Sequence, residues 1–284
     1  MNKYFGNLSN NKTIRNKQSA LFDTNHRNSL VHHFNDDYGD AYQINNYRII
    51  KELGKGSYGV VKLCENIDEN DKRYAMKIID KNKLKKLDFR SIKMKKNPIS
   101  NMIENEIKIL NIINHPNAVK CFEIIDKKDH QYTYFILEYM KKGSLKELVE
   151  KGIDIKKIWN YFRHLLLGIE YCHEQIKLIH FDIKPDNLLI DENNQLKITD
   201  FGISYQFKDD DIILKHNNRG TPFFKAPELT IDKPFHGKPC DIWSMGVTLY
   251  YTIYKIYPFY VNNQRDISKL NELIRNKEYF LYNI

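Results

Sequence analysis

The segment LIHFDIKPDNLLI, residues 178–190, places an aspartate, a lysine and an asparagine within six positions, namely Asp182, Lys184 and Asn187. The apolar runs on both sides of it are typical of short strands, so the polar groups fall in a loop that is held at both ends. A carboxylate, a cation and an amide at this spacing can converge on one reacting group. The segment TDFG adds Asp200 behind another predicted strand. The fold must therefore bring these two loops to one place.

Length and cysteine usage limit the classes of protein to which the chain can belong. A chain of 284 residues accommodates one large domain or two lobes with ample material for a core. The four cysteines lie far apart without a CxxC pair, so they match neither a zinc site nor a disulfide framework and indicate a reducing compartment. The N-terminus lacks the apolar core of a signal peptide, and the longest apolar stretch, residues 245–254, is too short to span a bilayer. We expect a cytoplasmic or nuclear protein without a membrane partner.

The net charge of +9 is concentrated in residues 81–96, where eight Lys or Arg accompany a single acid, Asp88. Two interpretations fit this run: a solvated helix or loop, and a docking patch for an acidic partner or nucleic acid. We favour the solvated interpretation, because runs of like charge usually lie in solvent. Nucleic-acid binding has little support, since only Phe89 interleaves with the charges and no known nucleic-acid motif is present.

The pattern of the chain changes at Tyr47. Residues 1–46 are rich in Asn, Asp and His and keep no helical or alternating period, so we predict a disordered polar tail. Three β-prone runs separated by turn residues follow, then the basic segment, a helix over residues 101–113 and two further strands. We predict an α+β fold with a β-rich lobe at residues 47–140 and a helical lobe at residues 141–284.

Two long helical patterns dominate the second lobe. Residues 155–175 carry apolar side chains on more than one face, so we expect that helix to be largely buried. Residues 239–254 form the other pattern, bounded by Pro239 and Pro258.

A glycine pattern, LGKGSYGVV, lies between the first two predicted strands. Because strand continues after it, the glycines belong to a hairpin rather than to the strand-to-helix turn of a dinucleotide-binding fold. Glycines let backbone N–H groups fold over phosphates, but an ordinary flexible hairpin explains the motif equally well on its own. The pattern comprises Gly54, Gly56 and Gly59, followed by Val61.

Lys77 ends the third predicted strand, where its ammonium group could reach phosphates beneath the hairpin. Such a lysine needs an acid to fix it, and the next helix offers Glu104 and Glu106. At about 100° per residue, Glu106 falls roughly 45° from the centre of the apolar face and Glu104 roughly 115° away. We therefore predict that Glu106 pairs with Lys77, although a surface glutamate would be the default interpretation without the other motifs.

The loop at 182–187 suits transfer of a phosphoryl group. Asp182 can orient a hydroxyl and accept its proton, and Lys184 can neutralise charge on the transferred group. Asn187 and Asp200 can ligate a divalent metal. A later segment of the chain ends with Ala226, Pro227 and Glu228. Segments of this kind bind peptide substrates. Each motif taken alone has a structural explanation, but the order and spacing of all the motifs together favour a catalytic function.

These motifs together resemble those of the eukaryotic protein kinase family, from Tyr47 to the C-terminus. The matching stretches are GKGSYGVV, YAMK, ENEIKIL, HFDIKPDN, DFG and KAPE. KPDN and GTPFFKAPE are similar to the serine/threonine branch. NNYRIIKELGKGSYGVVKL, DFGISYQF and GKPCDIWSMGVTLYYTIYKIYPF are similar to the calcium/calmodulin-dependent protein kinase kinases and related upstream kinases. Those enzymes carry a basic, proline-containing insert where this chain has the shorter segment 81–98.

The resemblance implies a bilobal fold that binds ATP and Mg²⁺ between its lobes and phosphorylates a protein, which could be the activation segment of another kinase. It implies catalytic roles for Asp182, Lys184 and Thr221, and metal ligation by Asn187 and Asp200. Lys77 would hold the α- and β-phosphates, with Glu106 fixing it. The other implied nucleotide contacts are the loop residues Leu53, Gly54, Lys55, Gly56, Ser57, Tyr58 and Gly59, the adenine neighbours Val61, Ala75 and Leu189, and the backbone groups of Glu138 and Met140. Calmodulin dependence is not decided by these residues.

The chain departs from the family at Phe181. Most members have arginine before the catalytic aspartate, and that arginine usually meets a phosphate on the activation segment. Phe181 cannot make this pair, and no Ser or Thr lies between Ser204 and Thr221. Thr221 occupies the position where the family contacts the catalytic aspartate and lysine. We therefore hypothesise that activity does not need Ser/Thr phosphorylation of this segment, with Tyr205 as the remaining alternative.

The sequence given ends at Ile284, before several helices that the family fold carries in its second lobe. The resemblance therefore implies a lobe truncated at its C-terminal end. It also implies that Glu228 lacks its usual arginine partner and that the helix at 241–254 exposes apolar surface. Two alternatives to an active kinase stay open, a nucleotide-binding pseudokinase that acts as a scaffold and an inactive fragment.

Overall fold

The structure of the chain is a computed structural model, which describes residues 43–56, 59–70, 72–85, 101–127, 130–208, 213–214 and 219–279. The chain forms two compact units. The described parts of Met1–Asn97 and Cys121–Tyr139 make up the N-terminal unit. The described parts of Pro98–Lys120 and Met140–Ile284 make up the C-terminal unit. The units differ from the predicted lobes, since residues 98–120 and Met140 belong with the C-terminal unit.

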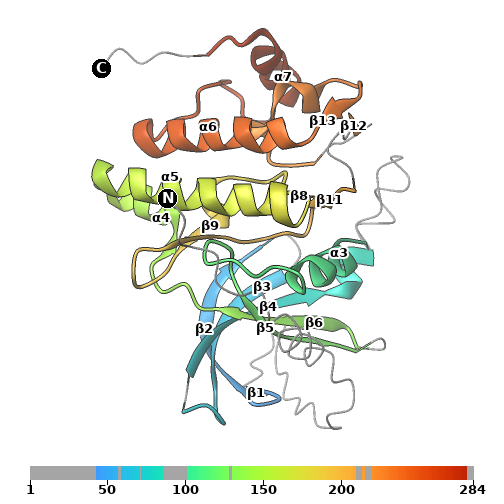
Figure 1. The fold of residues 1–284 in the computed structure, drawn as a ribbon, viewed down its shortest axis with the longest axis vertical. Helices are drawn as coiled ribbons and strands as arrows, with labels where there is room; N and C mark the ends of the chain where they lie inside the picture. The colour runs from blue at the N-terminus through green and yellow to red at the C-terminus, as the bar shows by residue number, and fades with distance from the viewer. Residues whose placement is uncertain are drawn as a thin grey trace, which may run out of the picture. The chain divides into compact units, whose positions relative to one another are not determined.

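A six-stranded antiparallel sheet forms the N-terminal unit (Figure 1). The predicted strands are all present, because β-branched and aromatic residues dominate them and turn residues separate them. In spatial order the strands are β1 (Gln43–Ile44), β2 (Tyr47–Lys55), β3 (Gly59–Asn66), β4 (Lys72–Asp80), β6 (Tyr132–Glu138) and β5 (Cys121–Asp126).

Alternation along β4 separates the two faces of this sheet. Tyr74, Met76 and Ile78 belong to one apolar cluster, in which Tyr74 packs edge-on against Tyr47. Ala75 and Lys77 alternate with them and so point to the opposite face. The cluster consists of Ile44, Tyr47, Cys64, Tyr74, Met76, Ile78, Ile125, Tyr134 and Ile136.

The sheet starts earlier than the sequence pattern predicts. Gln43 and Ile44 pair with Arg48 and Tyr47 as strand β1, and the Ile44 side chain is fully buried. The end of the predicted tail is therefore folded, because a single isoleucine completes the apolar cluster. Residues 1–42 lie outside the described residues, as do residues 86–100 of the basic segment. Within that segment, Lys81 forms an ion pair of 2.6 Å with Asp126.

Helices dominate the C-terminal unit. The helix predicted at 101–113 is α3 (Asn101–Leu110). Next along the chain is α4 (Leu145–Lys151), where Ser144 and Glu147 form a capping box. Asp154 caps α5 (Ile155–Glu170), which continues as the π-helical turn η2 (Tyr171–Gln175).

Helix α5 is less buried than predicted. Tyr161, Leu165 and Ile169 lie in the core, whereas Trp159 is 69% exposed and Leu166 is 55% exposed. The prediction of a largely buried helix was therefore wrong. The apolar residues form two stripes on different sides of the helix, and only one of them is covered.

Short paired strands and turns lie between the long helices. One sheet joins β7 (Gly143–Ser144), β9 (Leu188–Ile190) and β10 (Leu196–Ile198), while β8 (Leu178–Ile179) pairs with β11 (Tyr205–Gln206) and β12 (Ile213–Leu214) with β13 (Phe235–His236). The 3₁₀ turns are η3 (Pro185–Asn187), η4 (Pro222–Phe224) and η5 (Pro227–Thr230). Each turn has proline in its first positions, where the missing N–H costs no hydrogen bond.

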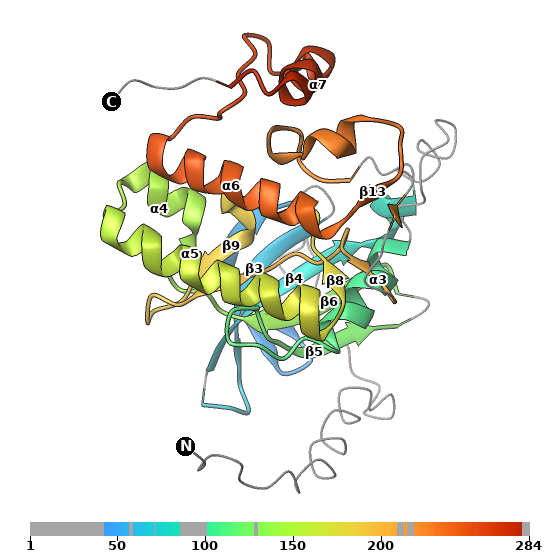
Figure 2. The same ribbon diagram turned by 45° about the horizontal axis from the view of Figure 1, so that its top comes forward.

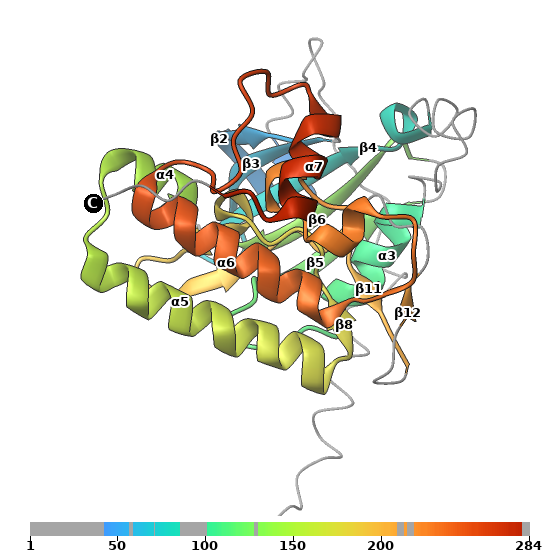
Figure 3. The same cartoon turned by 90° about the horizontal axis from the view of Figure 1, so that it is seen from above.

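Helix α6 (Lys238–Tyr254) lies alongside α5, as Figures 2 and 3 both show. It ends at Lys255, whose left-handed conformation closes the helix. Ile242 and Ile253 of α6 are 53% and 40% exposed, as expected for an apolar surface on this helix. The last helix, α7 (Ile267–Asn276), buries Leu270 and Ile274 against Phe259 and Val261. Among the described residues, no helix is both long and apolar enough to cross a membrane.

His164 of α5 predicts a pH-dependent stability. Its Nδ1 accepts a hydrogen bond from the Leu196 N–H at 3.2 Å, which requires a neutral ring. Burial, helped by Arg163, lowers the pKa of His164, while Asp191 partly opposes the shift. The unfolded chain therefore binds more protons than the folded chain once the pH falls below about 6.5, and the free energy of unfolding decreases there.

We expect His164→Asn to weaken this dependence, because the asparagine oxygen keeps an acceptor that does not titrate. Urea unfolding at about pH 7.5 and about pH 5.5 should show a smaller loss of stability for the variant than for the wild type. Identical losses for both proteins would contradict the assignment.

Candidate active site

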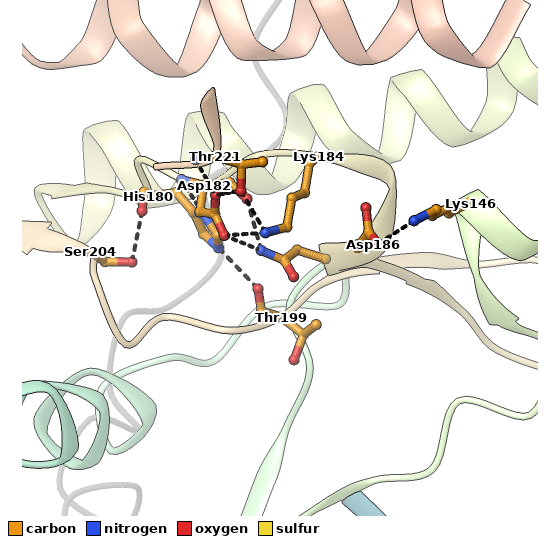
Figure 4. Close-up of polar contacts among 9 residues, drawn as sticks. Lys146, His180, Asp182, Lys184, Asp186, Thr199, Ser204 and Thr221 are labelled. Atoms are coloured by element: carbon orange, nitrogen blue, oxygen red, sulfur yellow. Dashed lines mark hydrogen bonds and ion pairs between the residues drawn. The ribbon is translucent and has the colours of Figure 1, made fainter. Parts of the chain in front are cut away.

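Three polar side chains meet around the carboxylate of Asp182 (Figure 4). Oδ1 accepts hydrogen bonds from the Thr221 backbone N–H at 3.0 Å and the Thr221 hydroxyl at 2.7 Å. Oδ2 accepts from Asn187 Nδ2 at 2.9 Å and forms an ion pair with Lys184 Nζ at 2.8 Å. Lys184 also donates to the Thr221 hydroxyl at 2.7 Å. The structure thus brings Asp182, Lys184, Asn187 and Thr221 together.

The amide of Asn187 is oriented by two hydrogen bonds. Its nitrogen donates to the carboxylate and to the backbone carbonyl of Asp182, both at 2.9 Å. The amide oxygen is therefore turned away from Asp182 and is available as an acceptor or ligand.

Asp200 is placed near Asn187 by strand pairing. In the β9–β10 hairpin Leu188 lies opposite Ile198, and the Thr199 N–H donates to the Asn187 carbonyl at 3.0 Å. Asp200 therefore follows directly beside Asn187, in a left-handed conformation with φ of 65°. Among the described residues, no cluster of three or more His, Cys, Asp or Glu side chains could hold a metal alone. An amide and a carboxylate oxygen fit Mg²⁺ that takes further ligands from phosphates and water.

A buried carboxylate anchors the loop that carries Asp182. Asp241, in the first turn of α6, is completely buried. It accepts the backbone N–H groups of His180 and Phe181, each at 2.8 Å, and contacts His173 Nε2 at 2.8 Å. The N-terminal end of α6 also favours a negative charge at this position. These bonds hold Phe181 at a positive φ of 66°, so that Asp182 faces away from the core.

The ring of His180 links the two loops of the site. Its Nδ1 accepts the Asp182 N–H at 3.2 Å, so Nε2 carries the proton and donates to the Thr199 carbonyl at 3.0 Å. The Ser204 hydroxyl donates to the His180 carbonyl at 3.3 Å, a contact also drawn in Figure 4. The loop at 180–182 and the segment that begins at Asp200 are therefore fixed to each other.

Helix α3 contacts the start of the same segment. Glu106 is 4% exposed, and a Cβ on Gly202 would lie 3.6 Å from its Oε2. Glu106 therefore faces the segment after Asp200 rather than solvent. The neighbouring Asn105 donates to the carbonyls of Gly202 and Ser204, at 3.3 and 2.9 Å.

The predicted nucleotide residues of the N-terminal unit share one face of its sheet. Val61 pairs directly with Lys77, and Ala75 lies two residues from Lys77 on the same strand. All three therefore point away from the apolar cluster. The face can present a small apolar surface next to an ammonium group.

The glycine hairpin is closed by a hydrogen bond of 2.9 Å from the Gly56 N–H to the Gly59 carbonyl. A Cβ on Gly59 would lie 1.9 Å from the Ile78 carbonyl, so the approach of β3 to β4 requires glycine there. Among the described residues, no atom lies within 4 Å of a Cβ built on Gly54. Leu53 and Lys55 belong to β2, whereas Ser57 and Tyr58 lie outside the described residues.

The remaining predicted nucleotide residues lie in both units. Glu138 ends β6 in the N-terminal unit. Met140, which is buried, and Leu189 of β9 belong to the C-terminal unit. Their roles toward a nucleotide stay predictions.

Glu228, which we expected to lack its usual arginine partner, contacts a cysteine thiol instead. Its side chain is only partly buried, and it accepts a hydrogen bond from the Cys240 thiol at 3.3 Å. Burial, with the adjacent Glu228 charge, raises the pKa of Cys240 far above its usual value, so the thiol keeps its proton as a donor. Glu228 therefore has a partner within the chain.

Sequence reasoning missed the residues that support the site, namely Asp241, His173 and Asn105. One signal was available, since Asp241 is the single charged residue in the apolar run PCDIWSMGV. A charge in a buried helix is rare unless it is paired. The others carry no such signal, because their partners are backbone carbonyls or residues that are distant in sequence.

The fold is that of a protein kinase. The profile of the protein kinase domain family matches residues 47–281, and the chain belongs to this family. Its members use ATP as the phosphoryl donor, as the resemblance of the motifs implied.

Curated relatives agree with the branch that the motifs predicted. The chain is 40% identical over 252 residues to a calcium/calmodulin-dependent protein kinase kinase of Caenorhabditis elegans, covering 82% of this chain and 45% of the relative. It is 39% identical over 233 residues to a probable serine/threonine-protein kinase of Dictyostelium discoideum, covering 81% and 31%. It is 34% identical over 236 residues to CBL-interacting protein kinase 28 of Oryza sativa subsp. japonica, covering 82% and 50%. The chain thus spans half or less of the length of these relatives.

We expect Asp241→Asn to loosen the catalytic loop, because an amide cannot accept hydrogen bonds at both of its terminal atoms. Leaving a buried N–H without its acceptor should lower the free energy of unfolding by about 1–3 kcal/mol. Urea unfolding measures the loss, and Asp232→Asn, at an exposed aspartate, is the matched control. Equal stability of the two variants would refute the anchoring role of Asp241.

Proposed function

We propose that the chain is an ATP-dependent serine/threonine protein kinase, which transfers the γ-phosphoryl group of ATP to a hydroxyl of a protein. The observation that carries this proposal is the convergence of Lys184, Asn187 and Thr221 on the carboxylate of Asp182. A structural loop has little use for four polar groups on one partly exposed carboxylate. The serine/threonine kinases among its relatives support the class of acceptor.

Asp182 would orient the substrate hydroxyl and accept its proton. Both of its oxygens already accept two hydrogen bonds each, so a substrate hydroxyl must replace one donor. Lys184 can leave most readily, because its ammonium group is on a flexible stem while Asn187 and the Thr221 backbone are fixed. In turning away, Lys184 would bring its charge to the transferred phosphoryl group.

Asn187 and Asp200 would hold Mg²⁺, which when bound neutralises the phosphate charges that develop in the reaction. Lys77, with Glu106 as its partner, would hold the α- and β-phosphates. Val61, Ala75 and Leu189 would contact the adenine, and Glu138 and Met140 would offer backbone groups to it. The glycine hairpin would cover the phosphates with backbone N–H groups.

The substrate class that we propose is the activation segment of another protein kinase. One relative is by name a kinase of calcium/calmodulin-dependent protein kinases, and it is 40% identical to this chain. An acidic partner at the basic segment 81–96 is a weaker proposal, because Lys81 is already paired with Asp126. We propose the cytoplasm or nucleus as its location, on the cysteine usage alone.

We expect Asp182→Asn to lower the rate of phosphoryl transfer by about 10²–10⁴-fold, because the amide cannot accept the proton. The measurement uses radiolabelled ATP, Mg²⁺ and a generic basic protein substrate, with Asp232→Asn as the control that should retain activity. Equal incorporation of radiolabelled phosphate by the wild type and Asp182→Asn would instead favour the pseudokinase scaffold, because the label would then come from a contaminant.

We further propose that activity does not depend on Ser/Thr phosphorylation of the activation segment. Phe181 is 3% exposed inside an apolar cluster, so it offers no cation to a phosphate. Ser204 is 1% exposed, and the Thr221 hydroxyl is held between Asp182 and Lys184. Neither hydroxyl is available to another kinase in this arrangement.

Treatment with a broad-specificity phosphatase should therefore leave the activity unchanged, with intact-mass spectrometry verifying that every phosphate has been removed. A phosphate on residues 204–221 whose removal abolishes activity would overturn this proposal. Tyr205→Phe separates the tyrosine alternative, since it should be as active as the wild type.

A further inference from the structure

Arg219, at the end of the activation segment, is held by two aromatic rings and two backbone carbonyls. Its guanidinium carbon lies 5.8 Å from the ring centre of Phe181 and 5.7 Å from that of Tyr205. Its Nη1 donates to the carbonyls of Ile203 and Ser204, at 2.8 and 3.2 Å. Arg219 therefore connects the end of the segment to its beginning and to the catalytic loop.

The contacts of Arg219 continue directly into the catalytic site. Arg219, Gly220 and Thr221 are consecutive, and they meet the consecutive residues Phe181 and Asp182. Arg219 faces the Phe181 ring, and a Cβ on Gly220 would lie 2.6 Å from the Phe181 carbonyl. Thr221 donates twice to Asp182. A shift of Arg219 would therefore move Thr221 relative to the catalytic carboxylate.

The same contacts reach helix α3 through a shared acceptor. The Ser204 carbonyl accepts from Arg219 and also from Asn105, which precedes Glu106 on α3. Asn105 also donates to Gly202, two residues after Asp200. One short stretch of backbone is thus bound from the helix on one side and from Arg219 on the other.

We propose that Arg219 is a positioning residue that orders the activation segment by cation–π and backbone contacts in place of a phosphate. Arg219 places a cation from the segment on an aromatic residue of the catalytic loop. This reverses the arrangement in which the loop supplies the cation and the segment supplies a phosphate. The proposal rests on the kinase activity proposed above, and it accounts for Phe181 as a partner rather than as a lost function.

The chemistry of the Arg219 contact suits a permanent interaction. Burial lowers the pKa of Arg219 from its usual value, but an arginine guanidinium keeps its charge at any physiological pH. We expect loss of the contact to lower the rate about tenfold, which corresponds to about 1.4 kcal/mol. A loss of this size lies within the range of a desolvated cation–π contact.

The test uses the full chain after phosphatase treatment. Arg219→Met, which keeps the length of the side chain, should lower kcat about tenfold with little change in the KM for ATP. Arg219→Lys should fall between Arg219→Met and the wild type, because it keeps the cation but loses the planar stacking. The matched control is Lys238→Met, which removes a cation 5.3 Å from the ring centre of Phe207 in the same unit and should retain the wild-type kcat.

An exchange of charges distinguishes positioning from general stability. Arg219→Glu should lower kcat, because a carboxylate then faces two rings and two carbonyls. Phe181→Arg should lower it as well, because two cations are then adjacent. The double variant Phe181→Arg/Arg219→Glu rebuilds an attraction between loop and segment, so its kcat should exceed that of either single variant.

Two results would overturn the inference while leaving the proposed function intact: a wild-type kcat in Arg219→Met, or a double variant no more active than the better of the two single variants. Melting temperatures are measured for every variant. If the Phe181→Arg proteins do not fold, the kcat values of the other variants test the inference. They should decrease from the wild type to Arg219→Lys and then to Arg219→Met. An inactive wild type that matches Asp182→Asn would show that the proposed function itself has failed.

Discussion

The catalytic geometry depends on one buried carboxylate, that of Asp241. Its two oxygens take the N–H groups of His180 and Phe181, which would otherwise be buried without acceptors. The two bonds set the direction in which the chain leaves the core, and so they set the direction of Asp182. The position of Thr221 follows from Asp182, which accepts two of its hydrogen bonds. An interaction at the start of a helix thus controls a site formed by loops.

Much of the fold could be predicted from the sequence because local signals agreed with tertiary packing. Strands β2 to β6 follow from β-branched and aromatic runs, and α6 from its bounding prolines. The prediction failed where the burial of one side chain mattered more than the polar composition of the residues around it. Ile44 draws the end of a polar tail into the sheet because its side chain completes the apolar cluster. On α5 the sequence showed apolar side chains on more than one face, but periodicity alone could not tell which of two stripes is covered.

Some residues of the candidate site could likewise be predicted from the sequence, and others could not. Asp182, Lys184, Asn187 and Thr221 were predicted and lie together, because their types and spacing reflect chemistry that few other arrangements need. The supporting contacts were not foreseen. Arg219 binds carbonyls, which every residue possesses, and its aromatic partners are distant in sequence. Such partners can be identified only when the three-dimensional path of the backbone is known.

Phe181 and Asp200 both adopt left-handed backbone conformations, with φ of 66° and 65°. For residues with a Cβ this conformation costs about 1–2 kcal/mol each, so the chain stores strain on either side of its catalytic groups. Glycine at either position would relieve the strain and remove a side chain that the site uses. A substitution to glycine would therefore set stability against the proposed activity at these two positions.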